Sequence, residues 1–137
     1  MENLEQSFAM LVLRLALGFN ILIHGLVRIT SVGAFREFLI KDFENTPLPT
    51  WSVAAFGTVL PFLETVIGAL LVLGLFSKWA LLSGGLLMIA LISGKCLQSD
   101  WHTVGVQMIY VFFYFFLLKD LGFDQFNLDT WLGRIGK

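Results

Sequence analysis

Four long apolar stretches dominate this sequence and constrain what the chain can fold into. They cover residues 8–29, 51–76, 79–97 and 103–118. A helix needs about 20 mostly apolar residues to cross the roughly 30 Å of hydrocarbon in a bilayer. Hydrophobic residues make up 57% of the chain and charged residues only 14%, which is too little polar surface for a soluble domain. The sequence therefore predicts an all-α integral membrane protein, a single domain over residues 1–137 with four transmembrane helices in a bundle.

The connections between these stretches predict how the helices run. Trp51, Trp79 and Trp101 lie beside predicted helix ends, as aromatic residues at a membrane interface do. The second and third spans are joined by a hinge over residues 76–79 that is short enough to require an antiparallel hairpin. Four spans place both termini on one side of the membrane. Basic residues divide equally between the two sides, and only Arg14 favours termini in the cytoplasm.

Two stretches outside the spans have a helical pattern and are too short to cross a bilayer. In the first, SVGAFREFLIKDF, Ser31 is placed to cap a helix whose apolar side chains face lipid or the bundle. Those side chains are Phe35, Phe38, Leu39 and Phe43. In the second, the stripe consists of Leu128, Trp131, Leu132 and Ile135, with Asp129, Arg134 and Lys137 outside it. We predict short interfacial helices, which either lie flat on the lipid headgroups or simply cap the ends of the bundle.

The first span carries polar side chains that are costly to bury in a membrane. At about 100° per residue, Arg14, His24 and Arg28 share one helix face, and Asn20 lies at its margin. Glu64 belongs to a stripe of small residues on the second span, so the two helices can approach closely. Antiparallel helices place Asn20 and Glu64 at similar depth, and we predict that Glu64 pairs first with Arg14. Arg28 is close enough to the far surface to extend its charge there.

This Arg/His/Glu cluster has two interpretations, a structural clasp that fixes helix register or a functional site. Hydrogen bonds inside a membrane contribute only about 0.6 kcal/mol on average, so a clasp is an inefficient source of stability. Ionisable groups inside a membrane are functional candidates by default. We therefore predict His24 and Glu64 as catalytic residues that handle a proton, and Arg14 and Asn20 as ligand-binding residues.

The fourth span adds Gln107, Tyr110 and Tyr114 on one helix face. Facing inward, they line the same interior as the cluster; facing outward, the tyrosines are ordinary interfacial residues. We predict that Gln107 and Tyr110 bind a ligand. Small residues beside the polar groups leave room for a flat apolar ring with polar oxygens, because such cavities are mostly apolar with few convergent donors. The sequence assigns no cofactor, and a quinone is one apolar ring that such a cavity would suit.

Other classes of site have weaker support in the sequence. Cys96 and His102 lie at one membrane end, towards which His24 also lies, but their spacing matches no closed zinc site. We therefore expect no metal. The single cysteine excludes an intramolecular disulfide. The net charge of −1 gives no indication of a nucleic-acid partner.

Two segments of the chain resemble a known membrane family. RLALGFNILIHGLVRI and PFLETVIGALLVLGLFSKWALL are similar to the DoxX family of small four-helix bacterial membrane proteins. The matching positions are Arg14, Leu15, Gly18, His24, Gly25, Glu64, Gly68 and the turn 74–78. The resemblance spans about residues 8 to 90 and implies a multi-pass protein of the bacterial inner membrane. It further implies the membrane subunit of a redox system, with a partner membrane or redox protein or a second copy of the chain. The alternative is a non-enzymatic assembly factor or a carrier of a hydrophobic ligand.

Overall fold

The computed structural model describes residues 2–133, and every regular element in that range is helical. The helices are α1 (Glu2–Ile29), α2 (Val32–Asp42), α3 (Thr50–Leu73), α4 (Ser77–Leu97), α5 (Trp101–Lys119) and α6 (Leu128–Trp131), with a 3-10 turn, η1, at Leu121–Phe123. Four segments are long and apolar enough to cross a membrane: Asn3–Ile29, Thr50–Leu73, Ser77–Leu97 and Trp101–Lys119. The prediction of an all-α membrane protein with four spans is confirmed.

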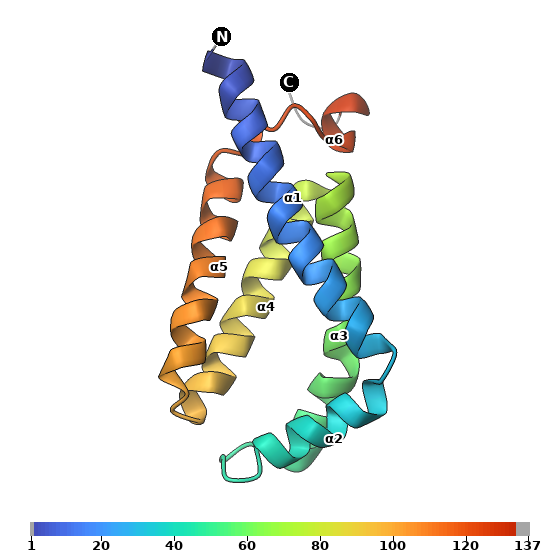
Figure 1. The fold of residues 1–137 in the computed structure, drawn as a ribbon, viewed down its shortest axis with the longest axis vertical. Helices are drawn as coiled ribbons and strands as arrows, with labels where there is room; N and C mark the ends of the chain where they lie inside the picture. The colour runs from blue at the N-terminus through green and yellow to red at the C-terminus, as the bar shows by residue number, and fades with distance from the viewer. Residues whose placement is uncertain (1, 134–137) are drawn as a thin grey trace.

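The helices form two antiparallel pairs (Figure 1). α1 runs the length of the bundle, α2 lies across its far end, and α3 returns beside α1. α4 and α5 make the second pair. The start of α1 and the short α6 lie at the same end, which we call the terminal end; the opposite end is the α2 end.

Close backbone contact joins α1 to α3. A methyl group added to a glycine at this contact would collide with the backbone of the facing helix, so only glycine allows the approach. Three facing pairs fix the register: Gly18 with Val72, Leu22 with Gly68, and Gly25 with Thr65. In each pair the two residue numbers add to 90, so Glu64 lies opposite position 26 of α1.

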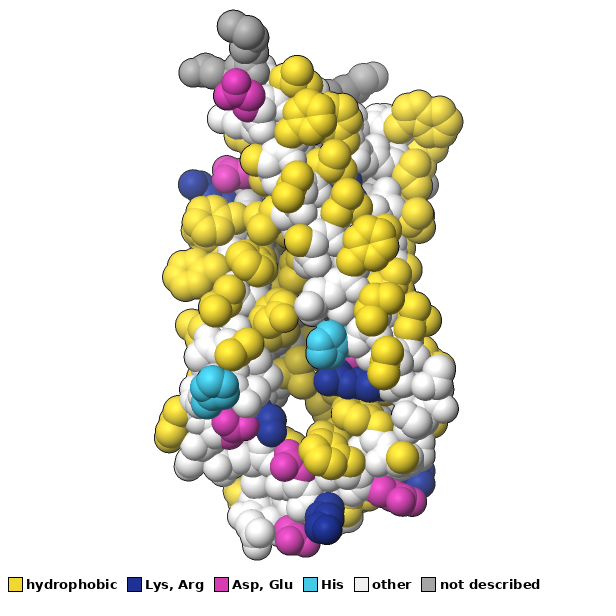
Figure 2. Space-filling model, viewed as in Figure 1, with side chains coloured by type: hydrophobic (Ala, Val, Ile, Leu, Met, Phe, Trp, Pro, Cys, Tyr) yellow, Lys and Arg dark blue, Asp and Glu magenta, His cyan; other side chains and the backbone are white. Residues whose placement is uncertain are grey.

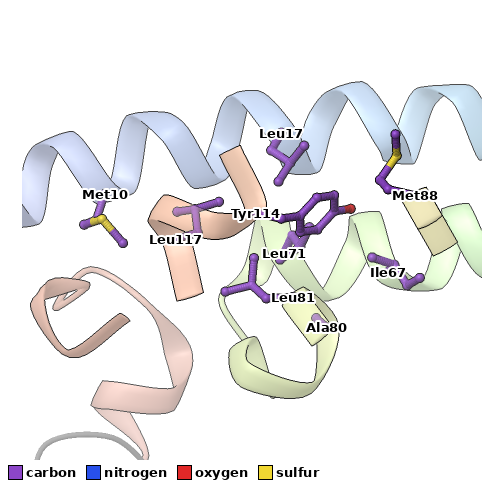
Figure 3. Close-up of a cluster of buried hydrophobic side chains, with 9 residues drawn as sticks. All are labelled: Met10, Leu17, Ile67, Leu71, Ala80, Leu81, Met88, Tyr114 and Leu117. Atoms are coloured by element: carbon purple, nitrogen blue, oxygen red, sulfur yellow. The ribbon is translucent and has the colours of Figure 1, made fainter. Parts of the chain in front are cut away.

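The apolar core fills the terminal half of the bundle (Figure 3). Leu17, Leu71 and Leu81 are at most 1% exposed and meet Tyr114 from α5. Tyr114 is itself only 3% exposed, and its ring lies against Gly84, where a side chain would leave it no space. The interpretation of Tyr114 as an interfacial residue is therefore wrong, because this ring is a core side chain.

The turn between α3 and α4 has the geometry expected of a tight hairpin. Gly74 ends α3 with a φ of +63°, and the amide of Leu75 donates to the carbonyl of Leu70. This is a glycine-terminated helix end, which satisfies carbonyls that the helix leaves free. The predicted antiparallel hairpin is present, although α3 ends at Leu73 rather than at position 76.

The two predicted interfacial stretches differ in outcome. α2 is a helix with no buried residue that packs against α3, which is compatible with both interpretations, and Ser31 at its N-cap makes no side-chain capping bond. Within the described residues, the second stretch contains the four-residue α6, with Trp131 and Leu132 exposed. Ile135 lies outside the described residues. Asp129, which lies outside the apolar stripe, is nevertheless buried, with 2% of its surface exposed, because it caps another helix as described below.

Candidate functional site

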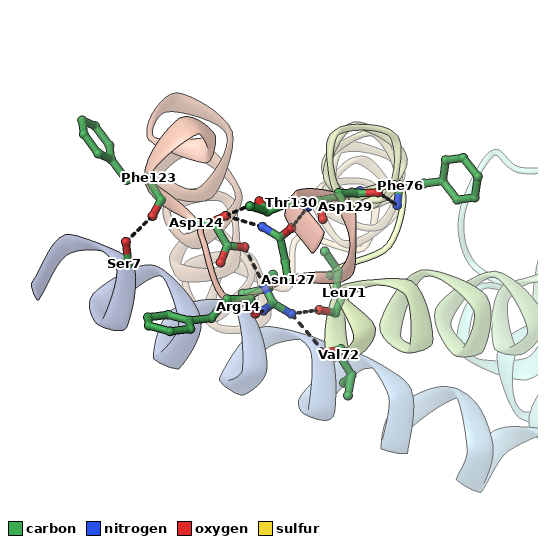
Figure 4. A network of polar contacts seen from close by, with 12 residues as sticks. Ser7, Arg14, Leu71, Val72, Phe76, Phe123, Asp124, Asn127, Asp129 and Thr130 are labelled. Atoms are coloured by element: carbon green, nitrogen blue, oxygen red, sulfur yellow. Dashed lines mark hydrogen bonds and ion pairs between the residues drawn. The ribbon is translucent and has the colours of Figure 1, made fainter. Parts of the chain in front are cut away.

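Arg14 is buried at the terminal end of the bundle, with 1% of its surface exposed. Its Nε donates to Asp124 Oδ2 at 2.7 Å (Figure 4). Its two terminal nitrogens donate to the carbonyls of Leu71 (2.6 Å), Val72 (3.0 Å) and Phe126 (2.7 Å). Leu71 and Val72 belong to the last turn of α3, where helix carbonyls lack partners of their own. Arg14 therefore ties α1 and the end of α3 to the segment that follows α5.

The segment that follows α5 is also hydrogen-bonded to the start of α4. The carboxylate of Asp129 accepts hydrogen bonds from the amides of Phe76 (2.9 Å) and Ser77 (2.7 Å), at the N-terminus of α4. A carboxylate is favourable there because it satisfies free amides and complements the helix dipole. Asn127 caps α6 by accepting from the amide of Thr130. We call Arg14, Asp124, Asn127 and Asp129 the terminal clasp.

The predicted pair between Arg14 and Glu64 is wrong. Glu64 pairs instead with Arg28, whose Nη1 donates to both carboxylate oxygens at 2.5 and 2.7 Å. The reason is the register: Glu64 faces position 26 and not position 20, a difference of six residues or about 9 Å at the helical rise. The prediction that Arg28 extends to the surface is also wrong, because its guanidinium turns towards Glu64 and covers the ring of Phe35 at 4.8 Å.

A cavity of about 610 Å³ opens between the two helix pairs, in the half of the bundle nearest α2. Polar side chains from all four spans line it, among them Asn20, His24, Arg28, Glu64, Gln107 and Tyr110; Ser52, Ser93, Lys95 and Thr103 lie on it as well. Its remaining wall is mostly apolar and includes Phe35 and Phe38 from α2. The space-filling view shows a hollow in the lower half of the molecule, with basic side chains near its rim (Figure 2). Arg14 is absent from this lining and lies in the terminal clasp.

Several polar atoms in the cavity wall have no partner among residues 2–133. Only the Nη1 atom of Arg28 donates to Glu64, so Nε and Nη2 have no hydrogen bond to a described residue. Gln107 Oε1 is buried and unpaired in the described part of the chain. His24, exposed at the cavity, makes no side-chain hydrogen bond with any described residue. A mostly apolar cavity with a few convergent polar groups is the usual form of a small-molecule site.

Polar contacts also close the α2 end of the cavity. Asp42, the last residue of α2, receives hydrogen bonds from Gln98 Nε2 (2.8 Å) and Lys95 Nζ (3.2 Å). Lys95 lies 3.6 Å from Asp100 as well. Asp100 caps α5, and the hydroxyl and amide of Thr103 hold the pKa of that carboxyl below its ordinary value. These bonds tie α2 to the α4–α5 hairpin.

Sequence reasoning missed Arg28 as the partner of Glu64, and it missed Asp124 and Asp129 entirely. For the two aspartates a signal was available, because Arg14 lies inside a span and needs a carboxylate at its own depth. Asp124 lies just after the last span, at the end of the bundle where α1 begins.

Comparison with known proteins identifies a family. A family model described as methylamine utilisation protein MauE matches residues 6–101, which are 96 of the 137 residues and run from α1 to the first residue of α5. No curated protein and no solved structure matches the chain. The DoxX resemblance is thereby corrected, since the matching family is a small multi-pass membrane family related in kind to DoxX and is not DoxX itself. The chain belongs to the MauE family of membrane proteins.

Proposed function

We propose that this protein is the membrane subunit of a redox system and binds a quinone-like apolar ring in the cavity between its helix pairs. The description of the matching family, methylamine utilisation protein, supports a role in such a system. The observation that carries the proposal is the lining of the cavity. Five of the six predicted site residues meet there: Asn20, His24, Glu64, Gln107 and Tyr110.

The size and polarity of the cavity suit a ring with a hydrocarbon tail. Its volume of about 610 Å³ is within the usual range of roughly 300–1,000 Å³ for small-molecule sites. The ring would lie beside the polar groups, and the tail would leave between α1 and α5 into the lipid. Asn20 and His24, both on α1, are exposed and line the cavity where the tail would leave.

The polar groups can manage the proton chemistry of a quinone. Two electrons and two protons convert the ring to a quinol, and a partner redox protein would be the source of the electrons. His24 would donate a hydrogen bond to one ring oxygen, and Glu64 would exchange a proton with it. Both residues approach the cavity from facing helices, α1 and α3.

Binding of a short-chain quinone to the protein, purified in mild detergent, tests this proposal. We expect saturable quenching of the native tryptophans, lost in His24→Ala and Glu64→Gln at a temperature where both variants remain folded. His102→Ala is the matched control, because His102 is exposed and lies outside the cavity lining. Absent binding, or binding unchanged in both variants, contradicts the proposal. The assembly factor or hydrophobic-ligand carrier then becomes the better function, and mass spectrometry of co-purifying proteins and lipids would identify its target.

We also infer that the protein resides in the bacterial inner membrane with its termini in the cytoplasm. Single cysteines at positions 41 and 78, placed in a Cys96→Ser background, test the orientation with an impermeant thiol reagent. Lys41 lies at the α2 end and Lys78 at the terminal end. Labelling of position 41 from the periplasm and of position 78 only after lysis is expected. The reverse pattern overturns the orientation, and labelling of both from one side overturns the four-span topology.

A further inference from the structure

We propose that the cavity is a half-channel for protons, a path that connects Glu64 and His24 to water at the α2 end of the bundle and not at the terminal end. This inference rests on the proposed function, because conversion of the ring to a quinol in that site consumes two protons. It names the side of the membrane that supplies them.

The cavity is bounded by hydrocarbon on the side of the terminal end. The apolar core fills that half of the bundle (Figure 3), and Leu17, Leu71, Leu81 and Leu117 in it are at most 1% exposed. A close-packed apolar layer offers water neither room nor hydrogen-bond partners. Protons therefore have no route between the cavity and the terminal end.

The opposite boundary, at the α2 end, is made of charged and polar side chains. Asp42 and Lys95 line the cavity, and their side chains are 31% and 25% exposed, so solvent reaches both. Charged groups retain their hydration because its removal is costly. The lining near this end also includes the hydroxyl side chains of Ser52, Ser93 and Thr103. This boundary is therefore closed to an apolar ring but open to water.

The polar lining continues from the α2 end into the bilayer along two helices. On each helix the residues are three or four positions apart, so they share one face. Each row begins within two residues of the helix end nearest α2 and extends about 10–12 Å inwards at the helical rise. The rows consist of Arg28, His24 and Asn20 on α1 and of Thr103, Gln107 and Tyr110 on α5.

The inner part of this path suits water. The Oε1 atom of Gln107 is buried and has no partner among residues 2–133, and a water molecule would satisfy it. Polar side chains inside membrane spans face one another or a water-filled cavity. Glu64 lies opposite position 26 of α1, between the levels of His24 and Arg28, so the path reaches its carboxylate.

The lateral opening between α1 and α5 does not offer protons another route, because it leads into hydrocarbon, where charge is costly. The α2 end therefore remains as the supply. With the termini in the cytoplasm, this end faces the periplasm. The ionisable groups along the path come from every helix from α1 to α5: His24, Arg28, Asp42, Glu64, Lys95 and Tyr110.

The test measures which side of the membrane sets the ionisation of a thiol inside the cavity. Gln107→Cys, in a Cys96→Ser background and in sealed membrane vesicles of one orientation, reacts with N-ethylmaleimide, which crosses the bilayer. The thiolate is the reactive form, so below the ordinary thiol pKa of about 8.5 the rate rises about tenfold with each pH unit. We expect this tenfold dependence on the pH at the α2 end, and a change of less than about twofold with the pH at the terminal end.

Three single-cysteine variants in the same background calibrate the measurement. Lys41→Cys reports the pH at the α2 end and Lys78→Cys the pH at the terminal end, since both lysines are exposed there. Phe112→Cys is the matched control on α5, because Phe112 is 59% exposed and lies outside the cavity lining. Its thiol faces lipid and should react slowly, at a rate that neither pH changes.

The outcomes separate this inference from the proposed function. A rate for Gln107→Cys that follows the terminal end, both ends or neither end overturns the half-channel. That result leaves the ligand site standing, because the labelling uses no quinone. Absent quinone binding, with labelling that follows the α2 end, overturns the proposed function alone. If Gln107→Cys does not fold, Asn20→Cys on the α1 wall of the cavity takes its place, with the same expectation.

Discussion

Removing the negative charge of Asp124 should strongly destabilise the protein. The Asp124 side chain is fully buried and that of Arg14 is 2% exposed, so neither charge is solvated. Breaking a buried pair by removing one partner costs about 3–5 kcal/mol. Arg14 keeps three backbone acceptors in Asp124→Asn, from Leu71, Val72 and Phe126. We therefore expect the low end, a loss of about 3 kcal/mol in the free energy of unfolding.

Thermal unfolding in detergent, followed by far-ultraviolet circular dichroism, measures this loss. A change of about 3 kcal/mol corresponds to a fall in melting temperature on the order of 10 °C for a chain of this size. Asp120→Asn is the matched control, since it removes the same charge from a half-buried residue with no ion pair among residues 2–133. The double variant Arg14→Gln with Asp124→Asn should recover part of the loss, because it leaves no charge unpaired. A melting temperature of Asp124→Asn within about 2 °C of wild type refutes the reasoning.

Three further changes probe other parts of the bundle. Glu64→Gln should lower the free energy of unfolding by about 1–2 kcal/mol, because its arginine partner is part-exposed; unchanged stability would argue against that ion pair. Gly68→Ala should cost about 1–3 kcal/mol through its collision with α1, whereas Gly85→Ala, with open space at its Cβ, should stay within about 0.5 kcal/mol of wild type. Because Thr103 lowers the pKa of Asp100 from its ordinary 3.8, the cap of α5 should persist above that pH and be lost as the pH falls through the lowered pKa. Slow hydrogen exchange of the Thr103 amide should disappear with the cap, and exchange independent of pH in that range, after correction for the intrinsic rate, would contradict it.

Hydrophobic pattern and turn residues predict most of this fold. The four spans, the α3–α4 hairpin and α2 follow from apolar length, from a short hinge and from helical periodicity. These features are local, so neighbouring residues decide them. The polar face of α5 is predictable for the same reason, and Gln107 and Tyr110 lie on the cavity lining.

The helix register is not predictable in this way. If the depth of each residue in the membrane is counted from the expected helix ends, residues 8 and 76, Asn20 lies level with Glu64. The glycine contacts instead place position 26 of α1 opposite Glu64, six positions further along the helix. The error arose because α1 begins at Glu2 and extends beyond the last turn of α3. Packing of Gly18 and Gly68 against the facing backbone determines the register, and no single-helix pattern contains that information.

The terminal clasp implies an order of events during synthesis. Arg14 and Asp124 are 110 positions apart, so the first span enters the membrane long before its carboxylate exists. During that interval Arg14 lacks the ion pair, at a cost of about 2.5–3.5 kcal/mol on insertion scales. The bond to Asp124 can form only after α5 has been inserted and the chain has returned to the terminal end. A nascent chain truncated before residue 124 would therefore expose an unpaired arginine to the quality-control proteases and chaperones of the membrane, and closure of the clasp distinguishes the completed protein from its precursors.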